Sequence, residues 1–249
     1  MKWHVKNMRN VAFTVDVEQD APPQLNTWHG MEEGLPALLD LLSKHDIRAT
    51  FFVTGETAKK FPRLISKIAK EHEVGCHGYK HERFDKLSAK EQLLRIETAT
   101  KILTKIVKQR VPGFRAPNFR PSVHTFAALK QLNYVYDASN ACYRIGPDPK
   151  PYGLVEIQNT WPSSLLRLPP GFSTHVLRLC LAALPLTVLD YHPWELVKMR
   201  NIRFDCRFST GDVALQRLDN VFKYLLERKC KFVLMRDVAK EKLASRGRP

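Results

Sequence analysis

The sequence predicts an α/β fold of parallel β/α units, because short apolar runs of strand length alternate with helical patterns along the chain. Of the 249 residues, 44% are hydrophobic and 26% are charged, which is typical of a folded globular protein and excludes a disordered or collagen-like chain. No repeat or low-complexity linker divides the sequence. We therefore expect a single domain over residues 1–249, arranged as a barrel or a doubly wound sheet, with a frayed basic tail over 240–249.

The first part of the chain alternates clear strand and helix signals. VAFTVD at 11–16 is an apolar run that ends on a carboxylate, and GLPALLDLLSKH at 34–45 has leucines at helical spacing. ATFFVTG at 49–55 is β-branched and aromatic, which predicts a buried strand. An amphipathic helix over 57–70 and a short strand over 73–77 follow.

The middle of the chain continues the alternation. A capping box, Ser88 with Glu91, predicts the start of a periodic helix that runs to residue 109. After it we expect a strand or loop over 111–117, a helix over 121–132 and a strand over 133–139.

The last third of the chain has weaker strand and helix signals. Residues 140–175 are rich in Pro and Gly and have weak periodicity, which predicts a loop-dominated segment. The most apolar stretch, 176–188, is interrupted by Arg178 and Pro185, so we expect a buried element or an interfacial loop there and no membrane span. The chain should then form a strand over 186–192, a long helix over 209–228 and a final strand over 231–235.

The charge balance is unusual: 40 Lys and Arg against 25 Asp and Glu give a net charge of +15. This surplus favours an anionic partner such as nucleic acid, a phosphorylated substrate or a membrane surface, although a solvated basic surface requires none. A basic nucleic-acid-binding protein without catalysis is therefore an alternative. The basic residues are, however, spread through the chain without a groove-reading motif, so we do not expect a nucleic-acid partner.

The cysteine pattern and the N-terminal sequence predict the compartment. Five cysteines are scattered along the chain without a CxxC pair, which indicates free thiols in a reducing environment. The apolar run after the charged start has only the length of a strand and ends at Asp16, unlike a signal peptide. We expect a cytoplasmic location, and the sequence does not predict an oligomeric state.

Ionisable residues stand at the ends of the predicted strands. These residues are Asp16, His77, Arg115, Asp137 and His192. In parallel β/α folds the carboxyl ends of the strands meet at one rim, and functional groups collect there. The pattern therefore predicts one site built from several strand ends.

Two sequence motifs in this group favour a metal site. His77 and His81 in HGYKH are four residues apart, so on a helical turn they would lie on one face and share a divalent ion. TVDVEQD adds three carboxylates, Asp16, Glu18 and Asp20, and the first two share a face of a strand. A metal with two histidines, one carboxylate and open positions would polarise a carbonyl and lower the pKa of a bound water. The second carboxylate would remain a general base, although an acidic turn after a strand is an alternative interpretation.

Five ordered motifs, TVDVEQD, HGYKH, FRAPNFRPS, YDAS and LDYHPWEL, resemble those of the polysaccharide deacetylase (NodB-homology) family, carbohydrate esterase family four, over about residues 10–240. The variant is the one with D-x-E in the first motif and H-G-Y-x-H in the second. The resemblance implies a distorted (β/α) barrel of about seven parallel strands. It also implies a metal-dependent hydrolase that removes an N-acyl group, typically acetyl, from an aminosugar or glycan.

The resemblance implies a role for each matching residue. Asp16 matches the base that activates a water on the metal, and Arg115 matches the arginine that orients this base. His77 and His81 match the two metal-binding histidines. His192 matches the general acid that protonates the leaving amine.

The carboxylate ligand departs from the better-known pattern, which has two adjacent Asp residues. Val17 follows Asp16 here, so the ligand would be Glu18 or Asp20, and we favour Glu18 because it shares a strand face with Asp16. The implied metal is Zn²⁺, with Co²⁺ or Ni²⁺ as alternatives.

Three further residues are weaker candidates. Asp137 stands in the fourth motif without its usual tryptophan, and it either tunes the site arginine or the second histidine, or is an ordinary turn aspartate. The backbone N–H of Asn118 is a candidate oxyanion donor. Trp161, in the loop 159–173, either lines a substrate groove or belongs to a hydrophobic plug that closes the barrel.

The expected substrate is an N-acylated aminosugar or oligosaccharide, and the charge of the protein favours an anionic one. Without a recognised signal peptide, a cytosolic oligosaccharide, a sugar nucleotide or a lipid-linked sugar is at least as plausible as an extracellular polymer. Relatives with the same fold suggest two alternatives: an amidohydrolase of a cyclic imide or ureide, and a deformylase of a lipid-linked aminosugar. The intact pair of His77 and His81 favours the metal-dependent enzymes over the imidases.

Overall fold

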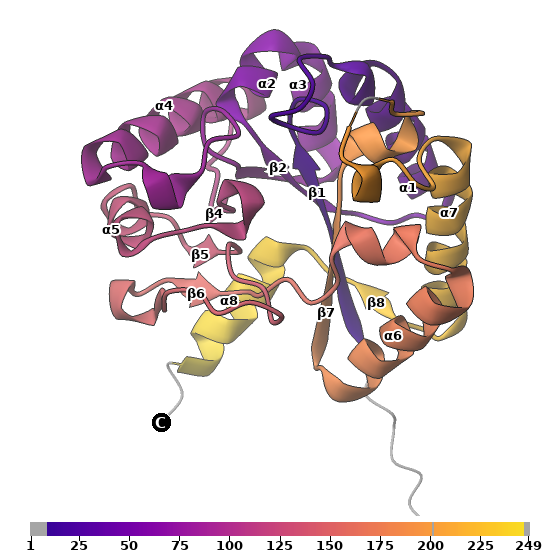
Figure 1. Ribbon diagram of the computed structural model, residues 1–249. Helices are drawn as coiled ribbons and strands as arrows, with labels where there is room; N and C mark the ends of the chain where they lie inside the picture. Colours follow the sequence, from indigo (N-terminus) through magenta and orange to yellow (C-terminus); the bar gives the residue numbers. More distant parts are fainter. Residues whose placement is uncertain (1–8, 201, 247–249) are drawn as a thin grey trace, which may run out of the picture.

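The computed structural model describes residues 9–200 and 202–246, and within them it has the parallel α/β architecture that the sequence predicts. Seven parallel strands follow the order β6-β5-β4-β3-β2-β1-β7, and an eighth pairs with the start of β1. Figure 1 shows the sheet curled into a distorted half-barrel with helices outside it, so the barrel alternative is confirmed. The strands are β1 (Asn10–Val17), β2 (Thr50–Val53), β3 (Glu73–Cys76), β4 (Gly113–Phe114), β5 (Tyr136–Asp137), β6 (Val155–Glu156), β7 (Leu186–Tyr191) and β8 (Lys231–Phe232).

Apart from α8, the helices cover the outer side of the sheet. In Figure 1, α4 and α5 lie on one flank, and α1, α6 and α7 lie on the other. None of the described helices is long and apolar enough to cross a membrane. The helices are α1 (Leu35–Lys44), α2 (Gly55–Lys60), α3 (Pro62–Glu71), α4 (Ala89–Val107), α5 (Val123–Gln131), α6 (Pro170–Ala183), α7 (Asp212–Glu227) and α8 (Met235–Arg246).

The residues of β1 alternate between the two faces of the sheet. Phe13 and Val15 belong to the large hydrophobic cluster that includes residues of the outer helices. Ala12 belongs to a second cluster, formed with residues of the other strands and of α8. Because side chains alternate along a strand, Thr14 and Asp16 share the inner face with Ala12. β1 therefore directs a carboxylate into the barrel at its carboxyl end.

The register of β1 places the ends of its neighbours beside that carboxylate. β1 pairs with β7 over six residue pairs, from Asn10↔Leu186 to Val15↔Tyr191. On its other edge, the second half of β1 pairs with β2 and its first two residues pair with β8. His192, directly after β7, thus lies at the same rim as Asp16.

The barrel closes through the segment that follows β6. Trp161 forms a parallel bridge with Leu189 of β7, its amide donates to the Val188 carbonyl at 3.0 Å, and the Asp190 amide donates to the Trp161 carbonyl at 3.0 Å. This closure is much shorter than the pairing of β7 with β1.

The C-terminal helix differs from the expected strand and tail. The final strand is limited to Lys231–Phe232, and α8 then runs to Arg246, so residues 240–246 are helical instead of frayed. Met235, Val238 and Ala239 of α8 are buried against the inner cluster of the barrel, which gives this otherwise polar helix its reason to fold there. Residues 247–249 of the expected tail lie outside the described residues.

One other expectation about an element is wrong. The single helix expected over 57–70 is two helices, because Phe61 leaves helical geometry and Pro62 starts a new helix at its first position. The segment 140–175 is loop-dominated as expected: apart from the short β6 and the start of α6 at Pro170, it consists mainly of loops and short 3₁₀ turns. The helix α6 continues through the apolar stretch as far as Ala183. The capping box of Ser88 and Glu91 is also present at the start of α4.

Candidate active site

Arg115 lies inside the barrel without exposed surface and binds two strand-end carboxylates. Its Nη1 donates to Asp16 Oδ1 at 2.8 Å and to Asp190 Oδ1 at 3.1 Å. Its Nη2 donates to Thr14 Oγ1 at 2.9 Å, and its Cζ lies 4.3 Å from the centre of the Phe52 ring. These contacts leave the guanidinium fixed, with one edge facing the carboxylates of β1 and β7.

The two carboxylates differ in protonation. Burial alone raises the pKa of Asp16, but Arg115, assisted by His77, outweighs it and holds the pKa of Asp16 below its usual value. Burial and the neighbouring charge of Asp16 raise the pKa of Asp190 to about 7. At neutral pH, Asp16 is therefore an ionised carboxylate, whereas Asp190 holds a proton more readily than an ordinary carboxyl.

A second group of side chains lies beside Asp16 at the rim. It consists of Glu18, His77 and His81. Glu18 Oε2 lies 3.3 Å from His77 Nε2 and 3.1 Å from His81 Nε2, and the three groups offer ligand atoms within 4.8 Å of one another. His77 Nδ1 donates to the Arg115 carbonyl at 2.8 Å, so in the neutral ring Nε2 presents a lone pair to the cluster. The end of β1 and the loop after β3 thus bring one carboxylate and two imidazoles together.

The chemistry of these atoms fits a divalent ion. Glu18 Oε2 and His77 Nε2 are buried and have no hydrogen-bond partner among the described residues, which is costly for polar atoms. One carboxylate oxygen and two imidazole nitrogens form a common ligand set for zinc at sites that keep an open position. The residues present therefore satisfy the requirements of such an ion.

Asp20, the alternative ligand, is used elsewhere. Its carboxylate accepts hydrogen bonds from the Thr27 hydroxyl and from the His29 and Gly30 amides, each at 2.8 Å. These three donors hold the turn that leads into α1. Asp20 is therefore engaged by these donors, whereas Glu18 lies with the two histidines.

His192 is supported by two residues that the sequence analysis did not single out. His192 Nδ1 lies 2.9 Å from Glu195 Oε1, and Arg167 Nη2 donates to Glu195 Oε2 at 2.8 Å. Burial lowers the pKa of His192, but Glu195, Asp190 and Glu18 outweigh it and raise that pKa to about 10. The imidazole is therefore protonated at neutral pH. Glu195 could have been found from its position three residues after His192 in LDYHPWEL, whereas Arg167 had no such signal.

The site opens into a cavity of about 210 Å³ at the carboxyl rim. Asp16, Glu18, His81 and His192 line it, together with Asn118, whose φ of 58° is left-handed. The complete lining also contains Ala21, Pro22, Gln24, Phe119, Arg167, Trp194, Arg203 and Cys206. Its walls therefore combine charged groups with aromatic rings.

Two candidates from the sequence do not line this cavity. Trp161 is 1% exposed and belongs to the main hydrophobic cluster, so the plug interpretation is the one observed and the substrate-groove interpretation is wrong. Asp137 is buried and accepts hydrogen bonds from the amide and hydroxyl of Ser139, at 2.9 Å and 2.6 Å. It is thus a turn aspartate, and Asp190 instead contacts the site arginine.

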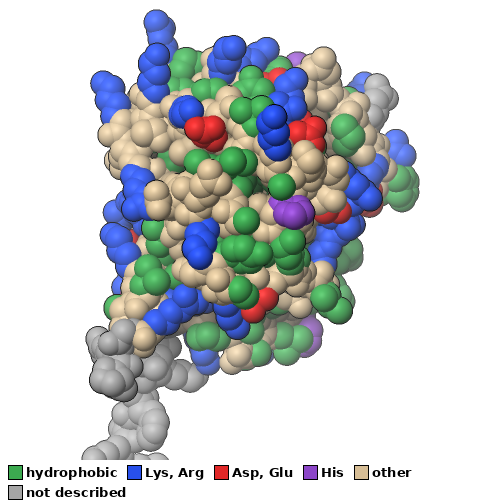
Figure 2. Space-filling view, turned by 90° about the vertical axis from the view of Figure 1, so that its left-hand side faces the viewer, with side chains coloured by type: hydrophobic (Ala, Val, Ile, Leu, Met, Phe, Trp, Pro, Cys, Tyr) green, Lys and Arg blue, Asp and Glu red, His purple; other side chains and the backbone are tan. Residues whose placement is uncertain are grey.

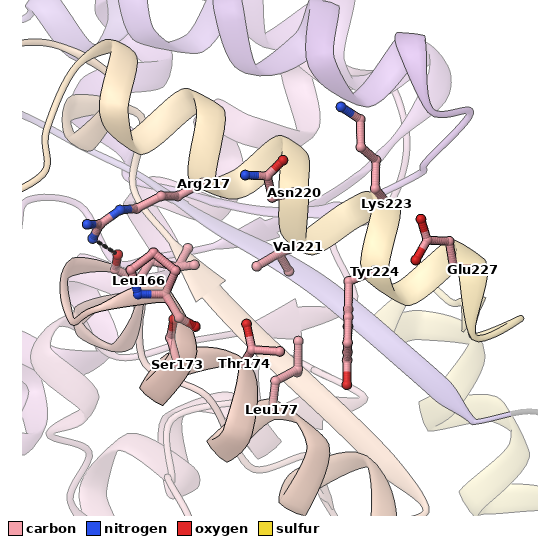
Figure 3. Close-up of a pocket in the computed structure, with 11 residues that line it drawn as sticks. Leu166, Ser173, Thr174, Leu177, Arg217, Asn220, Val221, Lys223, Tyr224 and Glu227 are labelled. Carbon is pink, nitrogen blue, oxygen red and sulfur yellow. Dashed lines mark hydrogen bonds between the residues drawn. The ribbon is translucent and has the colours of Figure 1, made fainter.

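A second hollow, of about 410 Å³, lies between α6 and α7 (Figure 3). In Figure 3, Arg217 reaches from α7 to the Leu166 carbonyl, a hydrogen bond of 2.7 Å, and Tyr224 and Glu227 lie further along the same helix. Glu227 is the one carboxylate among the described residues that line this hollow, and none of them is a histidine or cysteine. This hollow therefore lacks the groups that the rim site brings together.

Comparison with known proteins identifies the family, and the matching region contains the first three of the five motifs. The family model for polysaccharide deacetylases matches residues 6–136, which is more than half of the chain. The chain belongs to the polysaccharide deacetylase family. A peptidoglycan-N-acetylglucosamine deacetylase from Bacillus cereus is 37% identical over 90 residues, which are 36% of this chain and 31% of that protein. The match thus spans about a third of that relative's length.

Solved structures of polysaccharide deacetylases and their relatives share the fold. A polysaccharide deacetylase homologue from Mycobacterium smegmatis aligns with a TM-score of 0.73 at 22% identity, over 100% of this chain and 95% of that one. A family 4 acetyl xylan esterase from Clostridium thermocellum, solved with a cobalt ion, aligns with a TM-score of 0.63 at 17% identity, over 94% of this chain and 92% of that one. At these identities the likeness shows the fold alone.

Proposed function

We propose that this protein is a divalent-metal-dependent hydrolase that removes the N-acetyl group from an aminosugar of a glycan. The observation that carries the proposal is the convergence of Glu18, His77 and His81 beside the buried pair of Asp16 and Arg115. The Bacillus cereus relative acts, by its name, on peptidoglycan N-acetylglucosamine, which supports this substrate class.

Glu18, His77 and His81 would hold the metal. A metal bound there supplies a Lewis acid, which polarises the amide carbonyl and lowers the pKa of a coordinated water. The set of two nitrogens and one oxygen suits Zn²⁺, and the cobalt of the acetyl xylan esterase supports Co²⁺ as an alternative.

Asp16 acts as the general base. Arg115 holds its Oδ1, so Oδ2 is the oxygen left to accept a proton, and Oδ2 lies 3.6 Å from His77 Nε2 at the edge of the ligand cluster. The lowered pKa of Asp16 keeps this oxygen ionised at neutral pH. The attacking water therefore loses its proton to Asp16 Oδ2 on the side of the proposed metal.

His192 acts as the general acid. Glu195 holds its Nδ1, and its Nε2 faces the cavity, 3.9 Å from Glu18 Oε1. The protonated Nε2 is thus the atom placed to give a proton to the nitrogen of the leaving amine. Asp16 and His192 approach the cavity from adjacent strands, so one takes and the other gives a proton across the scissile bond.

The surface does not favour the nucleic-acid alternative. On the face shown in Figure 2, Lys and Arg side chains are separated by hydrophobic and uncharged ones and form no continuous band. A backbone of phosphates is usually followed by a connected basic stripe or groove. On this face, the positive charge is thus dispersed.

The test is acetate release from the neutral pentamer of N-acetylglucosamine, measured on the chelated protein before and after Zn²⁺ or Co²⁺ is added. We expect activity to return with the metal, and Asp16→Asn to lose turnover while still retaining metal. His124→Ala, on the exposed surface of α5, serves as the control. Full activity without metal or in Asp16→Asn would contradict the mechanism, and hydrolysis of cyclic amides in place of the pentamer would favour an imidase.

A further inference from the structure

A cluster of basic side chains lies at the rim of the cavity, on the loops that follow β3, β4 and β5. Arg83, Arg120 and Arg144 come from these three successive loops, and we call them the rim arginines. Arg144 Nη1 donates to the carbonyls of Asn118 and Phe119, at 2.9 Å and 3.2 Å, and both of these residues line the cavity. Arg144 is thus adjacent to the wall of the site, and Arg120 directly follows the wall residue Phe119 in the chain.

The negative charge among these side chains is insufficient to neutralise them. Asp85 is the carboxylate at their centre, and Arg83 already binds it through two hydrogen bonds, one of them from Nε at 2.9 Å. Arg120 Nη1 reaches the same carboxylate only at 4.0 Å. The nearby carboxylate of Glu82 is bound by Arg95 at 3.1 Å. Arg120 and Arg144 therefore carry charge that no described carboxylate compensates at hydrogen-bond distance.

The other arginines of the cavity differ in this respect. Arg167 donates twice to Glu195, and Arg203 donates twice to Asp205. The uncompensated charge is thus confined to one side of the mouth, near Asn118. In agreement, burial and the repulsion from Arg120 lower the pKa of Arg144. Like charges gathered in this way are stabilised when an anion binds between them.

We propose that the rim arginines bind an anionic group of the substrate, a phosphate or a carboxylate, while the aminosugar enters the cavity. This inference rests on the proposed function and specifies its substrate class: an acidic aminosugar glycan in place of a neutral one. Guanidinium groups suit both anions, because their planar N–H donors match two oxygens of a phosphate or carboxylate. The anion binds at the rim and not beside Asp16 and Glu18, whose carboxylates would repel it.

The experiment compares three disaccharide substrates on the metal-loaded enzyme. These are the neutral dimer of N-acetylglucosamine, its 6-O-phosphorylated form, and the N-acetylglucosamine–N-acetylmuramic acid dimer, which carries a carboxylate. We expect kcat/KM to be about tenfold higher for at least one anionic substrate at low salt, which corresponds to about 1.4 kcal/mol. The preference should fall as NaCl is raised, because partly exposed charges are screened. The substrate that gains more distinguishes phosphate from carboxylate.

Substitutions test whether the rim arginines cause the preference for anionic substrates. Arg120→Gln removes a guanidinium that contacts Asp85 only at 4.0 Å, so we expect the ratio of anionic to neutral kcat/KM to drop to about twofold or less. Arg120→Glu should invert the ratio. Arg63→Gln, an exposed arginine at the start of α3, is the matched control and should keep the tenfold ratio.

A binding measurement tests this inference separately from the proposed function. In metal-loaded Asp16→Asn, calorimetry with each disaccharide measures affinity without turnover. Tighter binding of an anionic dimer, lost in the double variant with Arg120→Gln, would support the rim site even if no acetate were released by the parent enzyme. Equal affinities and equal kcat/KM for all three dimers, with no effect of Arg120→Gln or Arg120→Glu, would overturn the inference and leave the deacetylase proposal standing.

Discussion

Replacing Arg115 by methionine tests whether its charge holds the barrel interior together. Arg115 is wholly buried and donates to Asp16, Asp190 and Thr14. Arg115→Met preserves the aliphatic stem but removes the guanidinium that binds the two buried carboxylates. Breaking a buried charge pair in this way costs about 3–5 kcal/mol. In a chain of this length 1 kcal/mol shifts Tm by about 2–4 °C, so Tm should fall by about 6–20 °C at neutral pH.

The loss of stability in Arg115→Met should be larger at neutral pH than at acidic pH. In the parent protein the pKa of Asp16 is lowered, so its ionised form adds stability at neutral pH that is lost as the pH falls through that pKa. In Arg115→Met the pKa of Asp16 should rise above its usual value, so the variant is penalised at neutral pH and relieved once the carboxylates are protonated. The gap in Tm between the two proteins should therefore be largest near pH 7.5 and shrink towards pH 5.

Thermal unfolding followed by circular dichroism, with a chelator present throughout, measures this gap without a contribution from metal. Arg115→Lys is the matched variant: it retains a charge but not the forked donors, so its loss should be smaller. The reasoning would be refuted by an Arg115→Met protein that unfolds within about 2 °C of the parent at pH 7.5. A gap that does not narrow at pH 5 would equally contradict it.

Three further predictions concern other parts of the molecule. His77→Ala and His81→Ala should each lose bound Zn²⁺ in elemental analysis of the purified protein, and retention of one equivalent by both would place the metal elsewhere. Glu195→Gln should lower the pKa of His192 from about 10 and move the alkaline limb of the pH profile of kcat/KM to lower pH; an unmoved limb would remove His192 as the acid. Ser88→Ala should cost about 1 kcal/mol of unfolding free energy in urea titrations, because it removes the cap of α4, and an unchanged midpoint would show that the cap contributes little.

The sequence predicts the site well where position along a strand decides the outcome. Asp16 and Glu18 share a strand face by simple alternation, and the ends of parallel strands must meet, so strand position alone places Arg115 and His192 at one rim. Asp190 required the register, because it lies within β7, opposite Thr14, before the strand ends. Asp137, the sequence candidate for tuning the site arginine, also stands at a strand end. Its carboxylate instead accepts hydrogen bonds from Ser139.

The sequence does not predict contacts between residues that are far apart in the chain and share no local pattern. Arg167 comes from a turn 28 residues before Glu195, in a segment without periodicity, so no local pattern links the two. The helix α8 buries only a few residues on the barrel floor, Met235, Val238 and Ala239, and its remaining surface is polar and solvated. A pattern based on apolar periodicity is too weak to detect such a helix.

The short closure of the barrel has a consequence for motion. On one edge β7 is paired with β1 over six residue pairs, whereas on the other it is held by the backbone of residues 160 and 161. If the weaker edge opens, we expect Asp16 and His192 to stay in register, because the longer pairing holds β1 and β7 together. Arg167, which follows the closing segment, binds Glu195, so loss of this contact while the edge is open would leave Glu195 less compensated and raise the proton affinity of His192. His192 would therefore stay protonated during local opening of this edge. We expect amide hydrogen exchange at Trp161 and Asp190 to be faster than at Val15, which would report the opening.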